Sequence, residues 1–96
     1  MPYIKDEMRD DIDIAVEDLD RSITTEGDLN YAITRIALRF IQRKGLRYST
    51  LSTVVGTLRL ATTEIEQRLV RPYENTKIRE NGDVTEYTQL IIDNKL

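Results

Sequence analysis

The chain contains no cysteine, no histidine and no tryptophan, and its only aromatic residues are one phenylalanine and five tyrosines. Without cysteine it forms no disulfide and no thiolate metal site. Without histidine it lacks the commonest general base, the commonest metal ligand and every histidine-based catalytic triad. We therefore expect no cofactor and favour a non-enzymatic protein, although an enzymatic activity that uses other residues stays open.

Long apolar runs are also missing. No segment approaches the roughly 20 apolar residues of a membrane-spanning helix, and the acidic start of the chain does not resemble a signal peptide. We expect a cytoplasmic protein without a membrane partner. With 96 residues, we expect one domain over residues 1–96, with residues 85–96 as a C-terminal extension or docking arm. So small a domain has little margin in its core, which favours a homo-oligomer.

Charge is divided unevenly along the chain. Residues 1–28 hold ten acids and three bases, residues 29–72 hold eight bases and two acids, and residues 73–96 hold five acids and three bases. One interpretation is an acidic helix beside basic helices, in the same chain or in a neighbour. The other is a basic concavity for an anionic ligand. A nucleic-acid groove is not expected, because such domains usually have a high isoelectric point and here it is about 4.9.

Apolar spacing of three and four residues predicts amphipathic helices. The first covers residues 5–24. The second begins with Asp28 as its N-cap and ends near Lys44, before Gly45. The third begins at Ser49 or Thr50 and carries a heptad-like apolar stripe to Leu69. Gly56 lies within it, either allowing close approach of another helix or merely tolerated.

The end of the chain has more than one interpretation. Pro72 removes a backbone donor and clashes with the preceding turn, so it should break or restart the helix, with a further two turns to Arg79. Asn81-Gly82 should end that helix, although Asn-Gly is also a strong hairpin-turn signal. The tail can form a final short helix. The predicted fold is all-α: a helical bundle of three main amphipathic helices plus a proline-broken C-terminal helix.

Four sequence blocks resemble a family of small uncharacterised proteins from bacteria, archaea and phages. The blocks are Pro2-Tyr3-Ile4, "GDLNYAIT" (residues 27–34), residues 48–58, and "PYENTKIRENGDV" (residues 72–84). Two features depart from the family pattern: an aromatic pair is replaced by Ile65-Glu66, and about a dozen residues follow Val84. The resemblance implies kinship and a shared fold, and it transfers no mechanism.

Seven polar side chains form the predicted ligand site. Arg68 and Arg71 share a helix face, and both arginine and tyrosine side chains bind phosphate well. The set also draws on the "GDLNY" and "NGD" blocks, which we expect to face each other. Its members are Arg68, Arg71, Tyr73, Lys77, Asn30, Tyr31 and Asp83.

Several of these residues also have purely structural explanations. Glu64 can pair with Arg68 one turn away, Asn30 can hold an irregular loop, and acids of the first helix can neutralise the Arg35 and Arg39 pair.

The sequence therefore favours an oligomeric helical binding protein of phage or mobile-element type, sequestering an anionic nucleotide signal in an anti-defence role. One alternative is a Mg²⁺-dependent nucleotide hydrolase using Asp10, Asp13, Glu17 and Glu64, because carboxylates at helical spacing can hold Mg²⁺. No metal site is assigned, since a facing row of acids is missing. Another alternative is an adaptor that docks a protein partner through its C-terminal segment.

Overall fold

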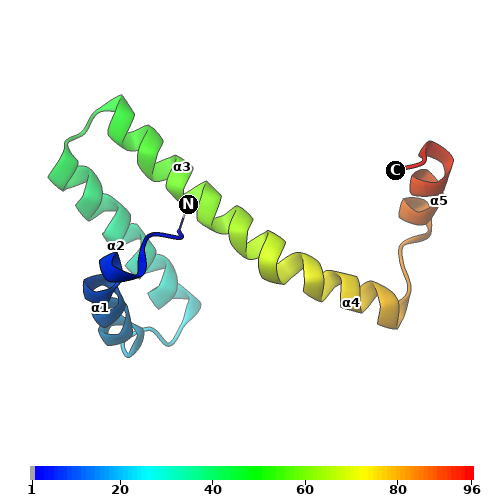
Figure 1. The fold of residues 1–96 in the computed structure, drawn as a ribbon, viewed down its shortest axis with the longest axis horizontal. Coiled ribbons are helices and arrows are strands. Elements are labelled where there is room, and N and C mark those ends of the chain that lie inside the picture. Colours follow the sequence, from blue (N-terminus) through cyan, green and yellow to red (C-terminus); the bar gives the residue numbers. More distant parts are fainter. Residues whose placement is uncertain (1) are drawn as a thin grey trace. The chain divides into compact units, whose positions relative to one another are not determined.

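The computed structural model describes residues 2–96, and all regular structure in that range is helical (Figure 1). This confirms the all-α class, while a bundle arrangement stays a prediction. The elements in chain order are η1 (Asp6–Met8), α1 (Asp10–Asp20), α2 (Glu26–Lys44), α3 (Tyr48–Ile65), η2 (Glu66–Val70), α4 (Arg71–Asn81) and α5 (Thr85–Asn94).

The chain divides into two compact units, Met1–Ala61 and Thr62–Leu96, which are described separately. The first unit holds η1, α1, α2 and most of α3, and the second holds the end of α3, η2, α4 and α5. The expectation of a single domain with a C-terminal extension stays a prediction.

The first predicted helix is shorter than its apolar pattern suggests. A 3₁₀ turn, η1, precedes it, and α1 ends at Asp20 rather than near residue 24. Arg9 holds the junction between η1 and α1, because its Nε donates a hydrogen bond of 2.8 Å to the carbonyl oxygen of Ile4. Beyond Asp20, the backbone N–H groups of Thr24 and Thr25 both donate to the Asp28 carboxylate. These two residues therefore belong to the start of α2 and not to the end of α1.

The start of α2 corrects the predicted N-cap. Thr25, not Asp28, is the N-cap, and its hydroxyl oxygen accepts from the Asp28 N–H at 3.1 Å. The Asp28 carboxylate accepts in return from the N–H of Thr25 at 3.1 Å. This reciprocal pair is a capping box, in which the acid belongs three positions inside the helix. Asp28 therefore takes part in capping the helix as expected, but as the third residue of the helix (N3) and not as the N-cap.

Glycine ends α2 and α4 as the sequence predicts. Gly45 has φ of +103° and Gly82 has φ of +88°, values that residues with a Cβ rarely adopt. The Gly82 N–H donates to the carbonyl of Ile78 at 2.9 Å. Helices lie on both sides of Asn81-Gly82, so the alternative of a hairpin at that turn is wrong.

The break at Pro72 is a change of helix type and not a gap. The π-helical turn η2 follows α3 directly, and α4 follows η2 with no non-helical residue between them. Pro72 lies in the first turn of α4, and since the helix continues into this turn without a gap, the missing N–H of Pro72 interrupts the backbone hydrogen-bond ladder. The π turn immediately before it accommodates the interrupted hydrogen-bond ladder.

Burial is slight in both units. Among the described residues, Thr50 alone is fully buried, at 6 % exposure, and no apolar side chain is. Half-buried apolar residues lie only in the first unit, where they mark its small core: Ile23, Ala32, Ala37, Phe40, Ile41 and Val54. A Cβ built on Gly56 meets no atom within 4 Å, so within the described chain no other helix approaches it closely.

No helix within residues 2–96 combines the length and the apolar character needed to cross a lipid bilayer.

Candidate functional site

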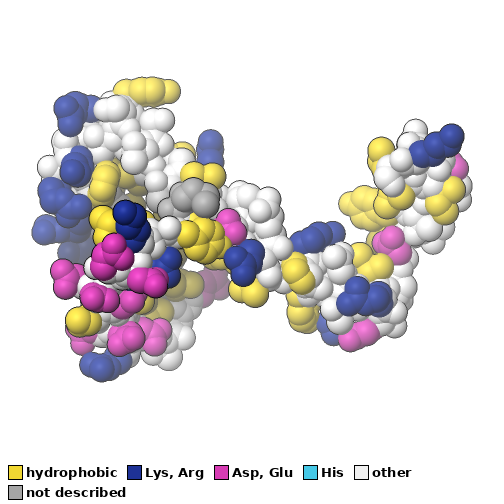
Figure 2. Space-filling view, in the orientation of Figure 1, with side chains coloured by type: hydrophobic (Ala, Val, Ile, Leu, Met, Phe, Trp, Pro, Cys, Tyr) yellow, Lys and Arg dark blue, Asp and Glu magenta, His cyan; other side chains and the backbone are white. Residues whose placement is uncertain are grey.

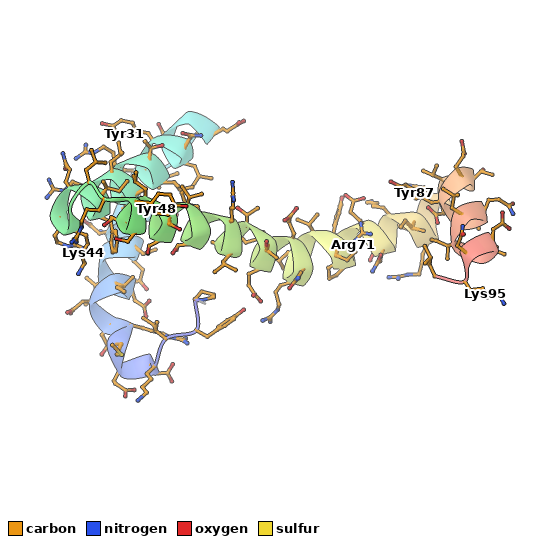
Figure 3. The ribbon with its side chains drawn as sticks, turned by 90° about the horizontal axis from the view of Figure 1, so that it is seen from above. Tyr31, Lys44, Tyr48, Arg71, Tyr87 and Lys95 are labelled. Carbon is orange, nitrogen blue, oxygen red and sulfur yellow. The ribbon has the colours of Figure 1, made fainter. Side chains whose placement is uncertain are left out.

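One face of α2 carries an aromatic side chain followed by three arginines. Tyr31, Arg35, Arg39 and Arg43 recur every four residues, a spacing that places neighbours on the same side of an α-helix. Tyr31 lies near the start of α2 and Lys44 at its end (Figure 3). We call Arg35, Arg39 and Arg43 the arginine stripe.

Aromatic rings support two of these cations. The Arg35 Nη1 donates to the Tyr31 hydroxyl oxygen at 3.3 Å, and its Cζ lies 5.8 Å from the centre of the Tyr31 ring. The Arg43 Cζ lies 5.5 Å from the centre of the Phe40 ring. Guanidinium groups over aromatic faces are partly oriented but keep N–H donors for another acceptor.

A groove of about 590 Å³ lies along the arginine stripe, between the end of α1 and α2. We call it the arginine groove. Its lining combines Tyr31 and the arginine stripe with aliphatic and aromatic side chains. The lining residues are Leu19, Ser22, Ile23, Asp28, Tyr31, Ala32, Arg35, Ile36, Arg39, Phe40 and Arg43.

The acids of α1 do not neutralise the arginine stripe. Acidic side chains gather over α1 and basic side chains over α2 (Figure 2). Within residues 2–96, however, no ion pair involves Arg35, Arg39 or Arg43. The expectation that α1 neutralises the Arg35 and Arg39 pair is therefore not met within one chain.

The single carboxylate in the groove lining already has a structural role. Backbone hydrogen bonds from the N–H groups of Thr24 and Thr25 hold the pKa of Asp28 below its usual range. A carboxylate with a lowered pKa is a poor general base near neutral pH. Asp28 therefore fixes the groove end of α2 and is not a candidate for proton transfer.

Five of the seven predicted site residues lie in the second unit. Arg68 lies in η2, Arg71, Tyr73 and Lys77 lie in α4, and Asp83 precedes α5. Lys77 is the best defined, since its Nζ lies 5.5 Å from the Tyr73 ring centre and 3.2 Å from Glu80 Oε2. Glu80 thus already supplies a counter-charge to Lys77.

Arg71, marked in Figure 3, borders a hollow of about 480 Å³ on the second unit. Val70 and Gln67 are among the other residues of that hollow. No ion pair involves Arg71 within residues 2–96, so it remains a candidate anion contact.

Asp83 and Asn30 make local contacts. The Asp83 carboxylate accepts from the Val84 N–H at 2.7 Å and from the Thr88 hydroxyl at 3.1 Å, which orders the start of α5. Asn30 accepts from the Thr34 hydroxyl through its backbone carbonyl at 2.8 Å. Each residue therefore has a structural explanation.

Two contacts in the structure involve predicted ligand residues. Tyr73 contacts Lys77, and both belong to the predicted set. Tyr31 contacts Arg35, which lies outside that set. Asn30 and Tyr31 belong to the first unit and the other five residues to the second. That the "GDLNY" and "NGD" blocks face each other stays a prediction.

The sequence-based site left out four residues that line the arginine groove: Arg35, Arg39, Arg43 and Phe40. The repeat of four residues from Tyr31 to Arg43 was a signal for the three arginines, but Phe40 lies outside that repeat.

The acidic row of α1 does not form a metal-binding cluster in the structure. Among residues 2–96, no group of three or more acidic side chains lies in an arrangement that could hold a metal ion. Of the four carboxylates proposed for a hydrolase, Asp10, Asp13 and Glu17 are exposed on α1, and Glu64 is half-buried on α3. Nothing in the described geometry supports that alternative.

The family model described as "Domain of unknown function (DUF6899)" covers residues 1–84. The chain belongs to this family. The match confirms the resemblance to an uncharacterised family, and it ends at Val84, directly before α5 begins at Thr85. No curated protein and no solved structure matches the chain.

Proposed function

We propose that this DUF6899 protein is a non-enzymatic, homo-oligomeric binding protein that holds an anionic ligand of the nucleotide class in the arginine groove. The observation that carries the proposal is the arginine stripe beside α1, because its three cations have no ion pair in the described chain. Like charges one turn apart repel each other, and a bound anion would relieve that repulsion.

The chemistry of the groove suits a ligand with a phosphate and a ring. Guanidinium groups bind phosphate oxygens through paired N–H donors. Tyr31 and Phe40 offer aromatic faces on which a base can stack, and Ile36 adds apolar floor. Its volume of about 590 Å³ falls in the range of about 300–1,000 Å³ that is typical of small-molecule sites.

Sequestration is the activity that fits such a groove. It binds an anion without presenting a general base to attack it, because its one carboxylate, Asp28, is held by the capping box. A phage or mobile-element protein of this kind would keep a nucleotide signal from its receptor, which is the anti-defence role we propose.

Oligomerisation is supported by the lack of burial. No apolar side chain among residues 2–96 is fully buried, whereas a stable small domain normally buries a substantial apolar core. A second copy would cover part of this apolar surface.

Ligand binding is tested by thermal shift and calorimetry with a panel of cyclic and linear nucleotides at low salt. For a nucleotide that stabilises the protein, Arg39→Gln should weaken binding roughly 10- to 100-fold, because a lost charge-assisted hydrogen bond costs about 1.5–3 kcal/mol. Arg59→Gln on α3 is the matched control, since Arg59 does not line the arginine groove, and its affinity should stay unchanged.

The same experiment separates the arginine groove from the site predicted on the second unit. Arg71→Gln should leave affinity unchanged if the arginine groove is the site. A loss of binding in Arg71→Gln but not in Arg39→Gln would move the site to α4. If no nucleotide in the panel stabilises the protein, the ligand part of the proposal is wrong.

A second candidate function, docking of a protein partner through the C-terminal segment, is favoured by the exposure of α5. Its apolar residues Tyr87 and Leu90 are 65 % and 57 % exposed. Deletion of residues 86–96 should abolish partner capture while leaving the helical content of the other elements in place.

A further inference from the structure

The helix α5 has an apolar face that nothing in the described chain buries. Tyr87, Leu90 and Ile91 follow the i, i+3, i+4 spacing of one helical face, and they are 65 %, 57 % and 44 % exposed. The helix has only 10 residues, and an isolated helix of that length is marginal in water. Its stability therefore depends on a surface that receives this face.

The first unit has an apolar groove suited to that role. It lies between α2 and α3 and has a volume of about 320 Å³. Ile36 and Phe40 line both this groove and the arginine groove. Its lining includes Ile33, Ala37 and Phe40 from α2, and Val54, Thr57 and Leu58 from α3. We call it the α2–α3 groove.

The two segments carry opposite net charge. Residues 29–61, which form α2 after its first turn and α3 to the end of the first unit, contain six bases and no acid. The segment of residues 83–96 contains three acids, Asp83, Glu86 and Asp93, and one base, Lys95. An amphipathic helix that lays its apolar face in a groove is a recurrent mode of recognition. No charged side chain lines the α2–α3 groove itself, so the opposite charges favour the encounter of the two segments while apolar side chains make the contact.

Two observations favour a second copy over the same chain as the source of α5. Only three non-helical residues, 82–84, connect α4 to α5, and short hinge connections favour exchange of an element between copies. The second unit has only 35 residues (62–96), has no cysteine and, over its described length, no metal-binding cluster. Units below about 40 residues without such staples usually need oligomerisation.

We propose that α5 of a second copy seats Tyr87, Leu90 and Ile91 in the α2–α3 groove, so that two copies exchange their C-terminal helices. The inference rests on the homo-oligomeric part of the proposed function and is independent of the ligand. It also gives α5, which follows the family match, a role as the element that joins two copies.

Cross-linking tests the contact directly, because the chain has no native cysteine. A Thr57→Cys chain and a Leu90→Cys chain, carrying different tags, are refolded together and treated with a short bismaleimide. We expect a covalent species that contains both tags. An Ile92→Cys chain is the matched control for Leu90→Cys, since Ile92 lies on the far side of α5, and it should give little of that species.

The absence of the mixed species would overturn the inference. A Thr57→Cys/Leu90→Cys double variant then shows where α5 lies instead: a cross-link within single chains would place α5 in the groove of its own chain.

Native mass spectrometry gives a second, independent measurement. Leu90→Asp should convert the oligomer to monomer, because it places a charge in an apolar groove. Ile92→Asp, which adds the same charge to the same helix on its far side, should leave the number of subunits unchanged. The same number of subunits in both variants would contradict the inference. An oligomer in the native protein together with no mixed cross-link would leave the homo-oligomer standing and refute only the exchange of α5.

Discussion

Thr25 and Asp28 show how two side chains determine where α2 begins. Each satisfies a backbone donor at the other's position, through contacts of 3.1 Å in both directions. The sequence predicted that Asp28 caps this helix, but it placed the cap three residues too late. Threonine and aspartate are both good N-caps, and only the reciprocal geometry decides between them.

Removal of the Thr25 hydroxyl should destabilise the first unit. In Thr25→Ala the Asp28 N–H loses its acceptor, and loss of an N-cap side chain costs about 1 kcal/mol. We expect a lower urea midpoint with an unchanged m-value. Thr24→Ala is the control, because Thr24 contributes only its backbone N–H to Asp28 and should behave as the native protein. Equal midpoints for Thr25→Ala and the native chain would contradict the capping role.

Asp28 should also make stability depend on pH in the acid range. Its folded-state pKa is lowered, first by the Thr24 N–H and then by the Thr25 N–H. The ionised carboxylate therefore adds stability above the unfolded value of roughly 3.9, and this stability is lost as the pH falls through the folded pKa.

The measurement is the urea midpoint from about pH 6 down to about pH 2. Asp28→Asn keeps an acceptor oxygen but cannot ionise, so its midpoint should fall less over this range than that of the native chain. Glu17→Gln on α1 is a control, because Glu17 lies outside the first turn of α1 and takes part in none of the described hydrogen bonds and ion pairs. Parallel curves for Asp28→Asn and the native protein would show that Asp28 is not the titrating group.

At the scale of the elements, the helices were predictable and the junctions between them less so. Apolar periodicity indicated α2, α3 and the C-terminal helices, since an amphipathic stripe is a repeated signal over many residues. The π turn η2 was not foreseen. Pro72 indicates an interruption, but whether the chain leaves the helix or changes its hydrogen-bond pattern depends on the energies of both local conformations, which the proline alone does not reveal.

Two glycines should respond oppositely to the same substitution. Gly82 has φ of +88°, so Gly82→Ala is strained and should destabilise the protein by about 1 kcal/mol or more. Gly56 lies inside α3, and a Cβ there meets no atom within 4 Å, so Gly56→Ala should stabilise by about 0.5–1 kcal/mol. Thermal unfolding of the pair measures both. Destabilisation by Gly56→Ala would instead indicate that a partner helix packs closely there.

The candidate site was only partly predictable at this scale. The Arg35 and Arg39 pair was visible in the sequence, and we expected the acids of α1 to neutralise it. The acids of α1 and the arginines of α2 lie on different helices, and exposed acids gain little from pairing in water, so opposite charges on neighbouring helices do not by themselves create an ion pair. The three ion pairs described, such as Arg21 with Asp18 at 3.3 Å, all join residues three apart.

For the whole molecule, the many exposed apolar side chains suggest that stability depends on protein concentration. If copies associate through these surfaces, folding is linked to association, and the melting temperature should rise with protein concentration. Scans across a hundredfold range of concentration measure this. Leu90→Asp should remove the dependence and Ile92→Asp should keep it. A melting temperature that is independent of concentration in the native chain would contradict a homo-oligomer in that range.

The exposure of apolar side chains also explains what the sequence could not reveal about the whole molecule. Apolar stripes predict that a helix face is buried, but not which surface covers it. In the described chain, Leu69 and Leu90 are 68 % and 57 % exposed, although their positions in the sequence look like those of core residues. If a second copy supplies the covering surface, as we propose, the periodicity of a single chain does not identify it.

The arginine stripe has a further consequence for identifying the ligand. Residues 29–61 hold arginine, lysine and tyrosine but no acid and no histidine, so they include none of the side-chain types that ordinarily titrate between about pH 5 and 9. A change in affinity across that interval would therefore report the protonation of the ligand itself. A terminal phosphate gains charge near pH 6 and should bind more tightly above it, whereas a cyclic phosphodiester should bind evenly. If the groove holds the proposed ligand, the pH dependence of its affinity thus distinguishes a terminal phosphate from a phosphodiester.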